Sequence, residues 1–345
     1  MLGQPIGLRR WLRVVPLAAV ASTAFPLAAA AHIKWFAPYC VPCQPKPLTQ
    51  VFNPSFIWLF VGGAVFLWLV CHVERTAFGS AVLRGIERVT APMRPRTEDM
   101  YRACTAAFFV SLFTLHDIIL TPELRTGLGA IPWLQAGMAI GMFWRPTMVL
   151  SAAGIVALYA YGIFTYGIFH LLDYPIFLTI AVYLGLTGAG IRKVFGFSPL
   201  DWARWGAGVT LIWASVEKWA YPQWTSPVLL AHPSLCMGLN SHFYMIAAGF
   251  VEFSLGFAML WTPLVRRLAA IVLSVMFISA IFSFGMVDAI GHLMIICCLF
   301  GIAADDQPIV RRPPLLAPAL YTASLAAILT TYYGLHALIY GTVIW

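Results

Sequence analysis

Two cysteines, Cys40 and Cys43, form a C-x-x-C motif within the stretch WFAPYCVPCQ. Thiols at this spacing can form a small disulfide, cycle between dithiol and disulfide, or bind a metal together with histidines. In the redox interpretation Cys40 and Cys43 are catalytic and carry electrons at the protein surface. The motif alone leaves all three interpretations open.

The surroundings of the motif exclude a thioredoxin-type site. There, a helix N-terminus within a βαβ domain lowers the pKa of the first cysteine. Here only about 20 residues separate the preceding apolar run from the next, too few for such a domain. Prolines also deny the segment a helix: Pro38, Pro42, Pro45 and Pro47.

Two charged residues inside apolar runs form a second candidate site. Glu252 lies near the middle of an apolar run, where a lone ionised carboxylate is costly. Lys218, at the end of the preceding run, is its nearest candidate partner. The pair either fixes helix packing or, as catalytic residues, positions and protonates an acceptor such as a quinone.

Histidines beside carboxylates supply a third set of candidates. His170 and Asp173 are three residues apart, and Asp288 and His292 are four apart, so each pair can share a helix face. Such pairs suit a metal site or a proton relay, although helix capping also explains them. The candidate cofactor-binding residues are Glu217, Asp288, His292, His170, Asp173, His116 and Asp117.

A copper site is a further hypothesis. Residues 1–31 have a basic start, an apolar middle and a run of alanines, which predicts a signal peptide or anchor. Cleavage after Ala31 would leave His32 as the N-terminus, where an α-amino group and an imidazole can chelate copper. The candidate metal ligands are His32, His232 and His242. The last two flank Cys236, which lies in the loop 222–241. This loop is also a candidate lid over the site.

The composition is that of a membrane protein. Of 345 residues, 61% are hydrophobic and 10% charged, and the arginines behind the net charge of +8 occur in short clusters between apolar runs. Nothing in the sequence indicates nucleic-acid binding. We therefore expect an all-α, polytopic helical bundle whose first partner is the lipid bilayer.

About ten mature transmembrane helices are expected. The apolar runs are 55–73, 103–121, 130–146, 148–167, 174–191, 205–221, 242–262, 267–286, 289–304 and 315–341. Basic residues mark every second loop, which the positive-inside rule assigns to the cytoplasm. The C-x-x-C segment and the C-terminus are then periplasmic in a bacterial cytoplasmic (inner) membrane.

The chain also contains an internal repeat. LQAGMAIGMFWRP (134–146) aligns without gaps with VEFSLGFAMLWTP (251–263), which places Gln135 on Glu252. Each stretch lies on the second helix of a four-helix unit. Because units with an even number of spans keep their orientation, the two repeats are expected to be parallel.

The second unit resembles the DoxX/DoxD family of four-helix membrane proteins. The matching features are Arg204 opening the first helix, Lys218 near its end, Glu252 within EFSLGFAMLW, the turn Arg266–Arg267, and Asp288 near the last helix start. The first unit is a weaker copy. The resemblance implies a membrane bundle with redox or thiol chemistry and leaves the substrate open.

These observations predict six regions. They are a signal peptide or anchor (1–31), a periplasmic C-x-x-C segment (32–54), a first transmembrane helix with a basic cytoplasmic loop (55–100), unit 1 (101–193), unit 2 (203–306) and a last transmembrane helix (315–345).

Three functions remain open from the sequence. The first is redox-linked electron transfer between a quinone and a thiol, sulfur or metal species. The protein would then be an oxidoreductase, and its partner would be a quinone or a periplasmic redox protein. The second is handling of copper or a small solute without turnover. The third is a structural role as a subunit of an oligomer or larger complex.

Overall fold

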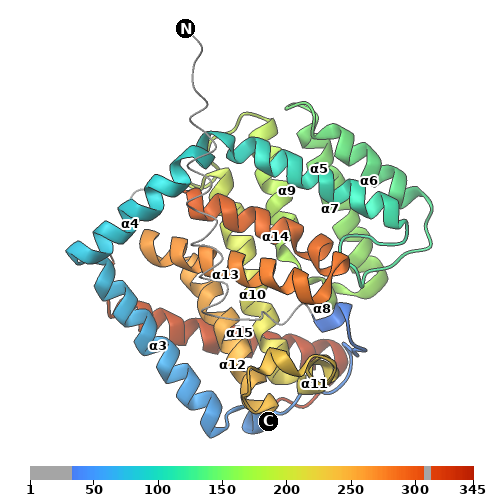
Figure 1. The fold of residues 1–345 in the computed structure, drawn as a ribbon. Coiled ribbons are helices and arrows are strands. Elements are labelled where there is room, and N and C mark those ends of the chain that lie inside the picture. The colour runs from blue at the N-terminus through green and yellow to red at the C-terminus, as the bar shows by residue number, and fades with distance from the viewer. Residues whose placement is uncertain (1–32, 307–311) are drawn as a thin grey trace.

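The computed structural model describes residues 33–306 and 312–345, so the predicted signal and His32 lie outside the described residues. The structure is 77% helical, without strands in its described part. It confirms the predicted all-α polytopic membrane bundle, and each of the ten apolar runs coincides with a helix (Figure 1).

The helices of the bundle follow one another with short connections. The first part of the chain forms α3 (Pro54–Glu74), α4 (Ala77–Thr90), α5 (Thr97–Leu115), α6 (Ala130–Gly141), α7 (Met148–Tyr166) and α9 (Pro175–Gly188). The second part forms α10 (Pro199–Ala220), α12 (Ser241–Met259), α13 (Pro263–Phe284), α14 (Met286–Ala304) and α15 (Leu316–Tyr340).

Shorter elements connect these helices. They are η1 (Ile33–Trp35), α2 (Leu48–Val51), η2 (Ala91–Arg96), α8 (Ile168–Leu171), α11 (Pro222–Ala231) and η3 (Pro233–Cys236).

Six of the described helices are long and apolar enough to cross a membrane: α3, α7, α12, α13, α14 and α15. Helix α9 is apolar but shorter, with 14 residues. Helix α6 spans only 12 residues, because the run 130–146 ends in turns before Pro146. Length and composition therefore support a multi-pass membrane protein.

Local sequence signals explain where these helices begin and end. Ser198 and Asp201 form a capping box at the start of α10, followed by Pro199 at the first helical position. Gly167 and Gly285 end α7 and α13 with positive φ angles of 88° and 74°, which suits glycine.

Helix α10 makes polar contacts at both of its ends. Arg204 in its first turns contacts Asp201 and Asp305, and Asp305 also pairs with Arg266. At its other end, the Ala220 carbonyl accepts a hydrogen bond from the Lys46 backbone. We call these the arginine end and the strap end; 16 residues of helix place them about 24 Å apart.

The strap consists of residues 33–53. Its backbone is fastened to the chain's C-terminal segment: the Leu48 amide donates to the Ile344 carbonyl at 3.0 Å, and the Tyr333 hydroxyl donates to the Lys46 carbonyl at 2.7 Å. The strap thereby closes the end of the bundle at which α10 ends and α15 finishes.

The predicted basic loop before residue 100 differs from the structure. Residues 77–90 form α4, an amphipathic helix, and residues 91–96 continue as η2. Arg94 on η2 donates to the Ala304 carbonyl at 2.8 Å and contacts Glu87 at the same distance. This part of the chain therefore packs along the arginine end.

Candidate functional site

A buried ion cluster lies beneath the strap, centred on Lys34. The Lys34 ammonium contacts Asp173 and lies 2.6 Å from Glu217 Oε1. The rings of Tyr39 and Trp224 lie 5.8 and 5.3 Å from the same nitrogen. Burial alone would lower the pKa of Lys34, but the two carboxylates hold it above its usual range.

Glu123, in the loop between α5 and α6, extends this cluster. Its carboxylate accepts hydrogen bonds from the hydroxyls of Thr121 and Tyr174. Burial raises the pKa of Glu123 to about 7. Glu123 can therefore keep its proton close to neutral pH, whereas Asp173 pairs with Lys34 as a carboxylate.

His170 borders the cluster as a neutral imidazole. Its Nε2 atom lies 3.9 Å from Glu123, and its ring packs against Tyr39 and Tyr166. Burial, reinforced by the charge of Lys34, lowers the pKa of His170 to about 3. His170 and Asp173 thus belong to one cluster but face different partners, since Asp173 turns to Lys34.

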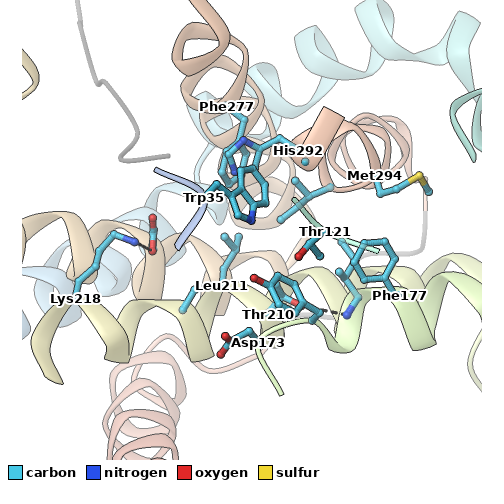
Figure 2. Close-up of a pocket in the computed structure, with 16 residues that line it drawn as sticks. Trp35, Thr121, Asp173, Phe177, Thr210, Leu211, Lys218, Phe277, His292 and Met294 are labelled. Atoms are coloured by element: carbon cyan, nitrogen blue, oxygen red, sulfur yellow. Dashed lines mark hydrogen bonds and ion pairs between the residues drawn. The ribbon is translucent and has the colours of Figure 1, made fainter. Parts of the chain in front are cut away.

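A cavity of about 60 Å³ adjoins the cluster (Figure 2). The predicted pair of Lys218 and Glu252 is present in its wall, with 2.6 Å between Nζ and Oε2, and joins α10 to α12. The cavity wall also includes Trp35, Asp173, Ile176, Thr210, Leu211 and His292.

The imidazole of His292 lies between two aromatic rings at the cavity wall. The ring centroids of Trp35 and Phe277 are 4.8 and 4.5 Å from that of His292. Gly291 makes room for the indole, because a Cβ at this position would overlap Trp35. The strap therefore contributes a wall of the cavity through Trp35.

Asp288 and His292 are close, as their spacing predicts. Asp288 Oδ1 lies 3.1 Å from His292 Nδ1, and the Asp288 side chain is fully buried. Neither Asp288 oxygen has a hydrogen-bond partner in the described part of the chain. A buried acceptor in this state favours a donor from a ligand.

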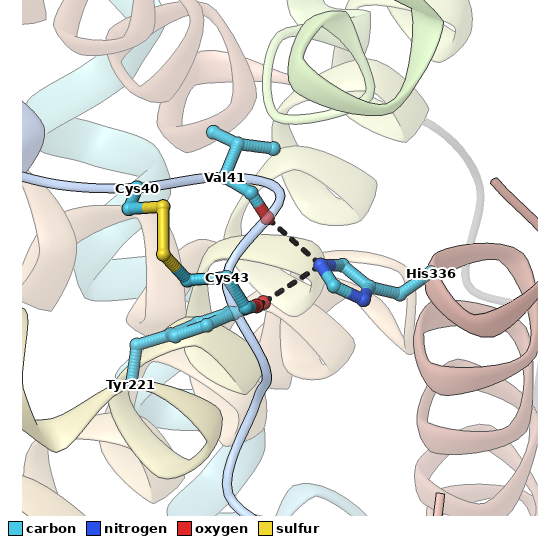
Figure 3. Close-up of a disulfide and its surroundings, with 5 residues drawn as sticks. All are labelled: Cys40, Val41, Cys43, Tyr221 and His336. Carbon is cyan, nitrogen blue, oxygen red and sulfur yellow. Dashed lines mark hydrogen bonds between the residues drawn. A yellow bond between two sulfur atoms is a disulfide. The ribbon is translucent and has the colours of Figure 1, made fainter. Parts of the chain in front are cut away.

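Cys40 and Cys43 are joined by a disulfide, with 5.4 Å between their Cα atoms (Figure 3). The Tyr221 hydroxyl donates to the Cys43 carbonyl at 3.0 Å and lies 2.8 Å from His336 Nε2. The same imidazole nitrogen lies 2.8 Å from the Val41 carbonyl oxygen. Tyr221, directly after α10, and His336 of α15 thus position the disulfide-bearing turn.

Several candidate residues lie apart from the cluster. Asp117 pairs with the exposed Arg125, and the neighbouring His116 ring packs on Phe113. The His232 ring packs against Phe284, and His242 is exposed in the first turn of α12. Within 33–306 and 312–345, no three His, Cys, Asp or Glu side chains form a group able to hold a metal.

The two repeat positions hold different contacts. Gln135, the counterpart of Glu252, is buried and donates to the carbonyls of Ile118 and Ile119 at 2.7 and 3.0 Å. It secures the loop after α5. Glu252 instead contacts Lys218 at the cavity, so the two aligned positions make different contacts.

Sequence reasoning missed Lys34 and Glu123. Lys34 stands in a short stretch between an apolar run and the cysteines, and its partner Asp173 is 139 residues away. Both residues are ionisable groups next to apolar runs, and this position is the one sequence feature that could have indicated a buried charge. The candidate lid at 222–241 does reach the cluster, because Trp224 of α11 packs over Lys34.

These features define a polytopic membrane protein with a buried polar site at one end. Comparisons with protein-family models, curated proteins and solved structures find no match for the chain. The site's own geometry therefore carries the functional argument.

Proposed function

We propose that the protein is a membrane oxidoreductase that passes electrons between thiols and a quinone, on the periplasmic side of a bacterial cytoplasmic membrane. One observation carries this proposal. A single segment, the strap, holds the Cys40–Cys43 disulfide at the surface and supplies Lys34 and Trp35 to the buried site. The resemblance to DoxX/DoxD proteins leads in the same direction.

The thiol step begins at the surface. Cys43 is exposed and Cys40 is half-buried, so a substrate thiolate attacks Cys43 Sγ and Cys40 leaves as a thiolate. The second substrate thiol then attacks the substrate sulfur of this mixed disulfide. The products are a substrate disulfide and the dithiol form of Cys40 and Cys43.

The quinone step regenerates the disulfide. The two thiols re-form their S–S bond and release two electrons and two protons, which convert one quinone to one hydroquinone. In this proposal Lys218 and His292 donate hydrogen bonds to the quinone oxygens, and Glu252 exchanges the proton. Tyr39, next to Cys40, contacts the Lys34 cluster and links the two parts of the site.

The cavity must widen for this reaction. A volume of about 60 Å³ holds a few water molecules and is smaller than a quinone head group. Trp35 is the wall residue best placed to move, because it belongs to the strap and not to a helix of the bundle. Reduction of the disulfide would loosen the turn that anchors this segment.

The experiment is a turnover assay. Purified protein in lipid nanodiscs is given dithiothreitol and a tail-less benzoquinone, and quinone absorbance is followed anaerobically. We expect Cys40→Ser and Cys43→Ser to lose turnover above the uncatalysed rate, and Cys236→Ser, a buried free cysteine, to keep it. Equal rates in all three variants would refute the proposal. Glu252→Gln should slow quinone reduction and leave thiol exchange intact.

Proton-linked handling of a small solute is a second candidate. It is favoured by the excess of buried acids at the strap end. Two lysines, Lys34 and Lys218, and two histidines, His170 and His292, lie against five acids there: Asp173, Glu217, Glu123, Glu252 and Asp288. A surplus of this kind requires protons or a cationic ligand. Proton release by purified protein on addition of a solute, with no quinone present, would favour this function.

A further inference from the structure

The strap closes the water-facing side of the cavity. Lys34 is locked between Asp173 and Glu217, and Trp35 fills the space that Gly291 leaves on α14. A lipid-soluble ligand would reach the site more directly from the membrane than from the aqueous side that the strap closes. Its route must then pass between two of the surrounding helices.

A groove on the surface of the bundle lies between α9 and α10. It has a volume of about 250 Å³ and is lined by Pro175, Thr179, Phe197, Trp202, Trp205, Gly206 and Val209. Its one hydroxyl, on Thr179, donates to the Ile176 carbonyl at 3.0 Å and is therefore satisfied. The lining offers an apolar chain flat aromatic surfaces, and its unsatisfied polar group is the buried indole nitrogen of Trp202, which has no hydrogen-bond partner in the described part of the chain.

The groove and the cavity share the same two helices. On α9, Pro175 and Thr179 line the groove while Ile176 lines the cavity. On α10, Val209 lines the groove while its neighbours Thr210 and Leu211 line the cavity. The two spaces are thus opposite sides of one seam.

Two contacts join α9 and α10 along this seam. The Ile176 amide donates to Thr210 Oγ1 at 3.1 Å, just after Pro175, which has no amide hydrogen to give. Further along, Gly206 lets the helices approach closely, since a Cβ there would overlap Thr179.

We propose that the groove between α9 and α10 holds the isoprenoid tail of the quinone whose head group enters the cavity. This inference rests on the proposed quinone chemistry and adds its substrate class: a membrane quinone with a long, methyl-branched tail. The apolar groove takes the tail, and the polar wall formed by Lys218 and His292 takes the head.

The test uses tail length as its variable. Val209→Trp fills the groove from its rim, and Val182→Trp places the same side chain on the lipid-facing side of α9 outside it. For Val209→Trp we expect KM for a long-tailed quinone to rise several-fold and KM for a tail-less quinone to stay unchanged. Val182→Trp should change neither.

A rise in both KM values, or in neither, would overturn the groove assignment while leaving the quinone reaction standing. If the wild-type protein reduces no quinone, the proposed function fails separately. The groove is then judged by photolabelling with a photoreactive isoprenoid chain. Labelling of the peptide around Trp205, lost in Val209→Trp, supports the groove, and labelling that persists in the variant contradicts it.

Discussion

At the scale of single residues, Lys34 is the most consequential side chain of the site. It is a buried cation with two carboxylate partners and two aromatic neighbours. Removing one member of a buried ion pair is expensive because the remaining charges lose their compensation in a low-dielectric environment. The strap's position over the cavity therefore depends on this residue.

We expect Lys34→Met to destabilise the protein by about 3–5 kcal/mol, because Asp173 and Glu217 lose their shared partner. Thermal unfolding in detergent measures this effect. Lys46→Met is the matched control on the same strap, where the backbone makes the fastening bonds. Unfolding of Lys34→Met at the wild-type temperature would contradict the cluster as described.

Glu123 predicts a pH dependence. Its pKa of about 7 in the folded protein exceeds the usual 4.5, so between these values the unfolded chain has lost a proton that the folded protein keeps. Its contribution thus lowers stability as the pH rises through this window. Between pH 5 and pH 8, the free energy of unfolding of Glu123→Gln should therefore rise relative to that of the wild type, by about 3 kcal/mol at most.

Unfolding temperatures at the two pH values measure this difference. Asp117→Asn, at an exposed carboxylate of the same loop, provides the comparison and should follow the wild type. If the unfolding temperatures of Glu123→Gln and the wild type differ by the same amount at both pH values, Glu123 is ionised throughout.

At the scale of elements, the contact between the strap and α14 determines how the cavity is closed. Trp35 fits only because residue 291 is glycine. Gly291→Ala should push the strap outward and raise the rate at which a reductant opens the Cys40–Cys43 disulfide. Gly334→Ala on α15 is the control, because nothing lies within 4 Å of a Cβ there. Equal reduction rates in the two variants would show that the strap does not depend on Trp35.

The helices themselves were largely predictable, because apolar runs of membrane length leave few alternatives. The pairing of Lys218 with Glu252 was also predictable, since both lie in consecutive runs and each needs a partner. The amphipathic helix α4 was missed because its arginines were assigned to a loop. In α4, apolar residues recur at helical spacing along one face.

The site as a whole was less predictable. Lys34, Glu123, Asp173 and Glu217 come from four separate parts of the chain, and no local pattern links them. The fastening of the strap to α10 and α15 holds the segment that carries Lys34 against the acids of the other three parts. His170 and Asp173 lie in the Lys34 cluster and Asp288 and His292 lie beside the cavity, whereas His116 and Asp117 lie apart from both.

At the scale of the whole molecule, the two ends have opposite characters. One collects Arg94, Arg204, Arg266 and Arg267, and the other holds the disulfide and the acid cluster. By the positive-inside rule we expect the strap end on the periplasmic side.

Labelling of reduced whole cells with a membrane-impermeant maleimide tests this orientation. Cys43 should react from outside, and a cysteine introduced by Arg84→Cys on α4 should react only after permeabilisation. The opposite order would place the thiol chemistry in the cytoplasm and remove the proposed location.

The most direct test of thiol-to-quinone transfer is a single anaerobic turnover. Protein with Cys40 and Cys43 reduced is mixed with one equivalent of quinone, and both products are quantified by mass spectrometry and absorbance. We expect one Cys40–Cys43 disulfide for each hydroquinone formed. Hydroquinone without the disulfide, or a dithiol that persists beside unreacted quinone, would contradict it.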